Sequence, residues 1–218
     1  MSVEFKPIVD DAPRSMRHPA VREQRKAKLT LPHMAKLTEY AARLRLRERV
    51  EVPDFDPHDG GIDARVLFLF EKPGPMTTDG SRFGNLSGSG FISRNNDDPT
   101  AEAILDFMQK AGIPRNLTVC WNVIPWWNGT RKVTRSELEQ GAACVKELIS
   151  MLPKLSAVVM VGQKASRAGR YLERTGLCLF TSDHPGPLVR AKFPERWNAI
   201  PSEWAKVARL FRESPESQ

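Results

Sequence analysis

One imidazole and two basic side chains lie close together near the end of the chain. His184 stands between Asp183 and a Pro-Gly-Pro turn, shortly after an apolar run that ends at Phe180, and Arg190 and Lys192 follow it. A nearby acceptor can orient the ring, so that a neutral imidazole points into a cleft as a hydrogen-bond donor. The pattern predicts a polar site at a strand end, although an isolated histidine at such a position is usually structural.

Polar and rigid groups also follow two earlier apolar runs. The turn "EKPGP" comes directly after residues 66–70, and its Gly74 lets backbone amides approach a ligand closely. Asn122 lies near the end of the run 117–124, and its amide can read the edge of a nucleobase because it offers both donors and an acceptor. An ordinary tight turn and a loop cap would contain the same residues.

Phe91 is a third candidate, in the segment "GSGFISRNNDD". An aromatic ring among small, flexible residues suits stacking on a planar ligand. Packing in the core is an equally good explanation of this residue.

Four apolar runs of strand length alternate with amphipathic helices. The strands are expected at 66–70, 117–124 and 157–162 and in "LCLFTSDHP"; the helices are expected at about 32–47, from Asp98 to near Gly112, after the Thr134 capping box, and in "QKASRAGRYLERTG". Such alternation predicts right-handed crossovers in an α/β fold, with a three-layer α/β/α architecture and a central mostly parallel four-stranded sheet. Ligands of these sheets bind beyond the carboxyl ends of the strands, where the turn "EKPGP", Asn122 and His184 are expected to converge.

The first fifty residues differ from the rest in charge. Residues 1–50 are predicted to form a basic N-terminal arm and helix, and residues 51–218 the α/β part, with one compact domain overall. The helix within the arm is expected to be either a solvated surface helix or a DNA contact.

The composition limits the function classes. The 218 residues are 40% hydrophobic and 27% charged, which is typical of a globular protein, and the net charge of +7 favours an anionic partner such as nucleic acid. Three cysteines without a CxxC pair support neither a disulfide framework nor a zinc or iron–sulfur site. No signal peptide or membrane-length apolar run is found, so we expect a cytoplasmic protein.

Four motifs in order resemble the uracil-DNA glycosylase superfamily. They are "FEKPGP", Phe91, "WNVIPWW" and "HPGPLVR", and the resemblance spans Val66 to Trp197. It implies a DNA glycosylase of a divergent class without an iron–sulfur cluster. Such an enzyme excises uracil, and other deaminated or damaged bases, by hydrolysing the N-glycosidic bond, and leaves an abasic site for base excision repair.

The resemblance also implies roles for the candidates. The base is flipped from the duplex, stacked on Phe91 and read by Asn122 beside the turn of Lys72, Pro73 and Gly74. His184 then stabilises the departing base anion.

The loop after this histidine is expected to bind the DNA backbone. Pro185, Gly186 and Pro187 press on the backbone, and Leu188 enters the space that the base leaves. Arg190 and Lys192 meet phosphates.

The first motif departs from the family pattern. Lys72 stands where uracil-specific members have a catalytic aspartate, and Glu71 aligns with a glutamate of an iron–sulfur relative. Glu71 is therefore the first candidate to position water, with Asn95 or Asn96 as the backup. Gly74 replaces a tyrosine that excludes thymine, so we expect a more open pocket.

The expected protein is a monomeric glycosylase without metal or other cofactor, acting on damaged DNA of a bacterial-type nucleoid and without a membrane partner. Because Lys72 replaces the aspartate, a non-catalytic, lesion-sensing DNA-binding protein is the alternative. A lyase that uses Lys72 to form a Schiff base is a third possibility.

Overall fold

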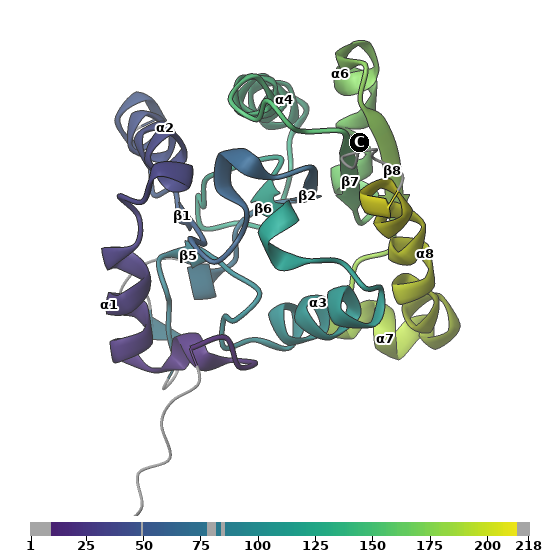
Figure 1. Cartoon of the computed structure of the whole chain (residues 1–218), viewed down its shortest axis with the longest axis horizontal. Coiled ribbons are helices and arrows are strands. Elements are labelled where there is room, and N and C mark those ends of the chain that lie inside the picture. Colours follow the sequence, from purple (N-terminus) through teal and green to yellow (C-terminus); the bar gives the residue numbers. More distant parts are fainter. Residues whose placement is uncertain (1–9, 49, 78–81, 84–85, 213–218) are drawn as a thin grey trace, which may run out of the picture.

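A four-stranded parallel sheet forms the centre of the protein (Figure 1). The computed structural model describes residues 10–48, 50–77, 82–83 and 86–212. The strands, in the spatial order β6-β2-β7-β8, are β2 (Val66–Phe70), β6 (Thr118–Asn122), β7 (Ala157–Val161) and β8 (Cys178–Ser182). All three strand pairs are parallel, which confirms the predicted sheet.

Helices cover both faces of the sheet. They are α1 (Pro19–Ala27), α2 (Pro32–Glu48), α3 (Pro99–Lys110), α4 (Arg135–Ser150), α5 (Gln163–Ser166), α6 (Gly169–Leu172), α7 (Pro187–Lys192) and α8 (Pro194–Arg212). In Figure 1, α2 and α4 lie on one side of the sheet, and α3, α7 and α8 lie on the other. The predicted three-layer α/β/α class is therefore confirmed. In the described part of the chain, no helix combines the length and apolar character needed to cross a bilayer.

Several short elements were not predicted, because two or three residues give no periodic pattern. β1 (Asp54–Phe55) pairs in parallel with β5 (Phe91–Ile92), and β3 (Arg82–Phe83) pairs antiparallel with β4 (Leu86–Ser87). The 3-10 helices are Ser15–Arg17, Gly61–Asp63, Pro75–Thr77, Arg115–Leu117 and Glu173–Thr175.

Local signals set the helix starts. The Asp98 side chain accepts hydrogen bonds from the backbone of Thr100 and Ala101 at the start of α3, and Thr134 with Glu137 forms the expected capping box of α4. The single helix expected after β7 is divided into α5 and α6, and α6 begins at Gly169.

The chain after His184 is more helical than the sequence predicted. The stiff loop expected there ends at Pro187, which begins α7, and α8 follows at once. Trp204 of α8 donates a hydrogen bond from Nε1 to Ser182 Oγ (2.9 Å) and packs edge-on against Phe68. These contacts anchor α8 on the sheet at the last residue of β8.

The strand register brings the carboxyl ends to one level. Phe70 is opposite Asn122, and Val161 is opposite Ser182. Side chains that follow β2, β6 and β8 therefore meet at one edge of the sheet, as the alternation predicted.

The basic N-terminal segment contributes to the core. Leu37 and Tyr40 of α2 are fully buried in the main core, and the Tyr40 hydroxyl donates to the carbonyl oxygen of Cys144 (2.6 Å). Arg25 of α1 is also fully buried and pairs with the buried Asp56. Part of the positive charge of this segment therefore stabilises the fold.

We predict that Arg25→Met destabilises the protein by about 3 kcal/mol, because it removes one partner of a buried ion pair and leaves the Asp56 carboxylate undercompensated. Arg43→Met is the control, because Arg43 pairs with Glu147 at the surface, where such pairs contribute less than about 1 kcal/mol. Urea unfolding measures both variants, and equal losses would contradict the assignment.

Candidate functional site

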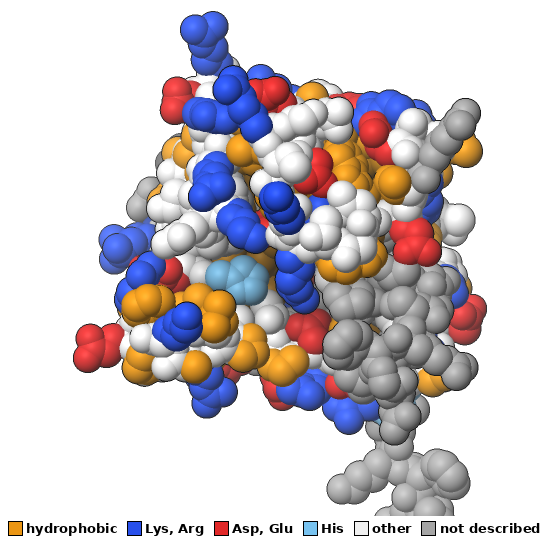
Figure 2. Space-filling model, turned by 180° about the vertical axis from the view of Figure 1, so that it is seen from behind, with side chains coloured by type: hydrophobic (Ala, Val, Ile, Leu, Met, Phe, Trp, Pro, Cys, Tyr) orange, Lys and Arg blue, Asp and Glu red, His pale blue; other side chains and the backbone are white. Residues whose placement is uncertain are grey.

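Two adjoining hollows lie at the carboxyl edge of the sheet. The inner cavity, of about 740 Å³, is bordered by the ends of β2 and β6, the segment 92–101 and the loop 127–131. The outer groove, of about 640 Å³, runs between the turn after β2, the start of α5 and helix α7. Residues that line both are Phe70, Lys72, Pro73, Thr100, Arg131 and His184. Figure 2 shows a histidine in a hollow that is bordered by Lys and Arg side chains and by an apolar patch.

His184 lies at the junction of the two hollows, and two glycines make room for its ring. A Cβ on Gly186 would lie 2.7 Å from His184 Nδ1, and one on Gly162 would lie 3.2 Å from His184 Cβ. The imidazole meets the edge of Phe70 and forms no hydrogen bond with a described residue. Burial, and then the Arg131 guanidinium, lower its pKa below the ordinary value. The ring is therefore neutral near pH 7 and available as a donor.

Asn122 is the second available polar group. It is the last residue of β6, is 4% exposed and lines the inner cavity. Within the described chain its side-chain amide forms no hydrogen bond, so both donors and the acceptor are free for a ligand. The structure therefore brings Asn122 and His184, from opposite edges of the sheet, to one cavity.

The acid of the first motif faces the outer groove. Glu71 lines this groove, and its Oε1 accepts a hydrogen bond from Lys164 Nζ (2.6 Å). Pro73 and Gly74 border the inner cavity, and a Cβ on Gly74 would lie 3.6 Å from Arg131 Nη2. The space beside Gly74 therefore holds the end of a flexible arginine.

Lys72 is fixed by ionic contacts. Its side chain is 3% exposed, and Nζ donates to Glu137 Oε1 (2.8 Å) and Asn128 Oδ1 (2.7 Å). Glu137 is also the capping-box residue of α4. The lysine therefore ties the turn after β2 to the loop that borders the cavity, and its ammonium group is occupied by these partners.

Phe91 and Asn95 lie outside both hollows. Phe91 is fully buried in a small apolar cluster with Met16 and Val21, and it borders a separate hollow of about 380 Å³. The side chain beside the inner cavity is that of its neighbour Ile92, because adjacent residues of an extended segment point in opposite directions. The sequence could not tell which of the two would face the site.

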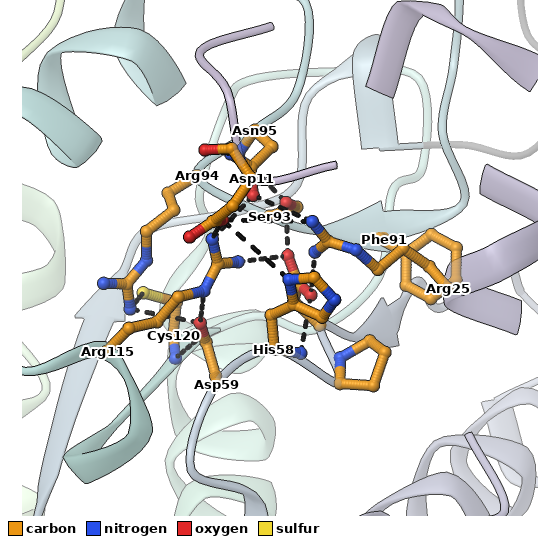
Figure 3. A network of polar contacts seen from close by, with 12 residues as sticks. Asp11, Arg25, His58, Asp59, Phe91, Ser93, Arg94, Asn95, Arg115 and Cys120 are labelled. Atoms are coloured by element: carbon orange, nitrogen blue, oxygen red, sulfur yellow. Dashed lines mark hydrogen bonds and ion pairs between the residues drawn. The ribbon is translucent and has the colours of Figure 1, made fainter. Parts of the chain in front are cut away.

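A buried ion-pair network behind the cavity wall holds Asn95 (Figure 3). Asp56 accepts hydrogen bonds from Arg25 and Arg115, and Asn95 Oδ1 accepts from the same two guanidiniums. Asn95 Nδ2 donates to the carbonyl oxygens of Asp11 and Ala12. Asn95 therefore joins the N-terminal segment to the wall.

Asn96 and two carboxylates belong to the cavity wall itself. Asn96, Asp97 and Asp98 all line the inner cavity. Burial raises the pKa of Asp98, whose carboxylate caps α3. Asp97 is only 12% exposed in its side chain, and its cationic neighbours are at 3.8 Å (Arg14) and 4.0 Å (Arg17). From the sequence, Asp98 was predicted only as the start of a helix, and Asp97 was not predicted as a site residue.

The chain after His184 presents apolar and basic side chains beside the outer groove. Pro185 and Gly186 are buried, and Pro187 is the first residue of α7. Leu188 is 67% exposed and, with Lys192, lines the outer groove.

A basic residue of α7 packs on α8. The Arg190 guanidinium lies 4.9 Å from the centroid of the Trp197 ring.

Among the described residues, no group of three or more His, Cys, Asp or Glu side chains is arranged to hold a metal ion.

We predict that Arg131→Gln raises the pKa of His184, because loss of a nearby positive charge favours protonation of the imidazole. Arg190→Gln is the control, because the Arg190 guanidinium packs on Trp197 instead. NMR titration of the imidazole measures both, and an unchanged pKa in Arg131→Gln would rule out the electrostatic cause.

The lowered pKa of His184 also predicts how stability depends on pH. Since the unfolded chain binds a proton at His184 more readily than the folded protein does, the free energy of unfolding should fall as pH decreases from about 6.5 towards the folded pKa.

Comparisons with known proteins find a structural likeness but no match by sequence. No protein-family model and no curated protein matches the sequence. Among solved structures, the chain is similar to a mimivirus uracil-DNA glycosylase, solved as a point variant in complex with UGI. The identity is 15%, the alignment covers 78% of this chain and 71% of that chain, and the TM-score is 0.40. A likeness at this level assigns no activity.

Proposed function

We propose that the protein is a DNA glycosylase that holds an extruded base in the inner cavity. The observation that carries this proposal is the position of Asn122 and His184, two side chains without hydrogen-bond partners in the described chain that line the same cavity. One can read the base edge, and the other can stabilise the charge that develops on the base. Base-reactive enzymes need such a pocket because the base must leave the stack before it can react.

The outer groove is proposed to bind the DNA backbone. Lys192 lines it, together with Lys164 and Arg196, which pair with Glu71 and Asp183. Basic side chains such as Lys192 neutralise phosphates. Leu188 extends from the same surface and is proposed to occupy the space that the base leaves. Because His184 lies where the groove meets the cavity, the sugar is expected at this junction.

Hydrolysis then breaks the C1′–N bond, and both bonding electrons pass to the base. Water adds its hydroxyl group to C1′, and its proton balances the charge of the released base. A neutral His184 donates a hydrogen bond to the base oxygen on which negative charge develops. We propose deaminated and other damaged bases as substrates, uracil among them.

Glu71 is proposed to position the water. The attacked sugar lies on the groove side of the base, and Glu71 lines the groove, whereas Asp97 lies on the wall of the inner cavity. The ion pair with Lys164 holds the Glu71 carboxylate in position.

One observation favours a second function, that of a lesion-binding protein without catalysis. Lys72 replaces the expected aspartate and is fully engaged with Glu137 and Asn128, so the first motif supplies no acid to the inner cavity. Such a protein would bind damaged duplexes without turnover.

We predict that the protein excises the base from a duplex carrying one uracil or another deaminated base, and that His184→Ala lowers the rate by about 100- to 1,000-fold, as for loss of an oxyanion donor. Strand cleavage by hot alkali measures the abasic product. His18→Ala is the control, because His18 lines neither hollow. Binding of these duplexes without any excision would establish the second function instead.

We predict that Glu71→Gln lowers excision by about 100-fold or more and leaves duplex binding unchanged, because the amide cannot act as a base. Asp97→Asn is the matched control on the inner wall. A larger loss of excision in Asp97→Asn would transfer the role to that carboxylate. Single-turnover excision and fluorescence anisotropy separate the rate from the affinity.

A further inference from the structure

A buried arginine lies at the floor of the inner cavity, away from the Asn122 end. Arg94 is 2% exposed and lines the cavity. Its Nη2 donates to Thr118 Oγ1 (2.8 Å) and lies 3.6 Å from Cys120 Sγ. Thr118, Cys120 and Asn122 alternate along β6 and share one face of the strand, about 7 Å apart in succession. The guanidinium is therefore deeper than the level at which Asn122 meets a ligand.

The Arg94 guanidinium has donors that the protein does not use. Nε is buried without a hydrogen-bond partner, and within the described chain Nη1 forms no hydrogen bond. The carboxylate oxygen that pairs with Arg94, Asp59 Oδ1 (3.2 Å), is shared with Arg115 Nε (3.0 Å). Figure 3 shows Arg94 and Arg115 converging on Asp59. An arginine offers no acceptor and stays charged, so this floor presents donors and positive charge.

We propose that Arg94 is a specificity-determining residue that selects bases with a carbonyl oxygen or a deprotonated ring nitrogen at the edge that reaches the floor. This inference rests on the proposed glycosylase function and specifies its substrate class. If an exocyclic amino group of the base lay at the floor, its N–H donors would face those of the Arg94 guanidinium. The buried guanidinium would then have no acceptor from the ligand. We expect the smaller ring of a pyrimidine, when it is held at Asn122, not to reach this level.

The cavity has the size that this substrate class needs. Its volume of about 740 Å³ is within the range of roughly 300–1,000 Å³ for small-ligand sites. Deaminated purines that carry two carbonyl groups, such as xanthine, match the donors of the floor, whereas adenine does not. The same positive charge stabilises the electron pair that the base retains when the C1′–N bond breaks.

The test compares excision of xanthine and of uracil from otherwise identical duplexes by the full chain. Arg94→Lys keeps the charge but loses the planar fork, so the ratio of kcat/KM for xanthine over uracil should fall by about tenfold or more. Arg115→Lys is the matched control, because it also loses a guanidinium contact with Asp59 Oδ1 but its side chain does not line the inner cavity. Urea unfolding shows whether the two variants lose similar stability.

An unchanged ratio in Arg94→Lys, or an equal change in Arg115→Lys, would overturn the inference while glycosylase activity stands. If the wild type excises neither base, the proposed function fails, and binding of the free bases then tests Arg94 separately. Equilibrium dialysis should show tighter binding of xanthine than of adenine to the wild type. This comparison uses only the wild-type protein, so it does not depend on the folding of a variant. Equal binding of the two bases would also overturn the inference.

Discussion

The carboxylate of Asp56 is buried from water and must be compensated where it lies. Burial by itself would raise its pKa, but the guanidiniums of Arg115 and Arg25, with the Ser93 hydroxyl, lower it far below the ordinary value. These partners come from α1, from the segment before β6 and from the wall of the inner cavity. Loss of any one partner would leave the buried Asp56 carboxylate without full compensation. This electrostatic requirement therefore holds three distant segments together.

The inner cavity takes its shape from this network. Residues 93–96 pass between the Asp56 cluster and the cavity, so they have polar partners behind them and a ligand-sized space in front. The opposite wall is held by the ion pair of Lys72 with Glu137. A cavity between two fixed walls suits a site in which donors are oriented before the substrate arrives, because such donors need no reorganisation during the reaction.

Much of the fold could be predicted from local patterns. The continuous apolar run of β2, the Asp98 cap and the Thr134 capping box are each complete within a few residues, and the structure confirms them. Asn122 and His184 could be placed together because parallel strands align their carboxyl ends. The helix α7 and the division of the segment after β7 depend on contacts with distant parts of the chain, and they were missed.

The sequence by itself determined the α/β order and the edge of the sheet that holds the polar residues, and it placed Asn122 and His184 among the candidates there. Only the tertiary structure decided that Phe91 packs against Met16, that Asn95 binds the N-terminal segment, and that Arg94 forms the floor of the cavity. The physical reason is the range of the interactions. Periodicity and capping act between near neighbours, whereas the burial of an aromatic ring or a charge depends on groups that folding brings from elsewhere.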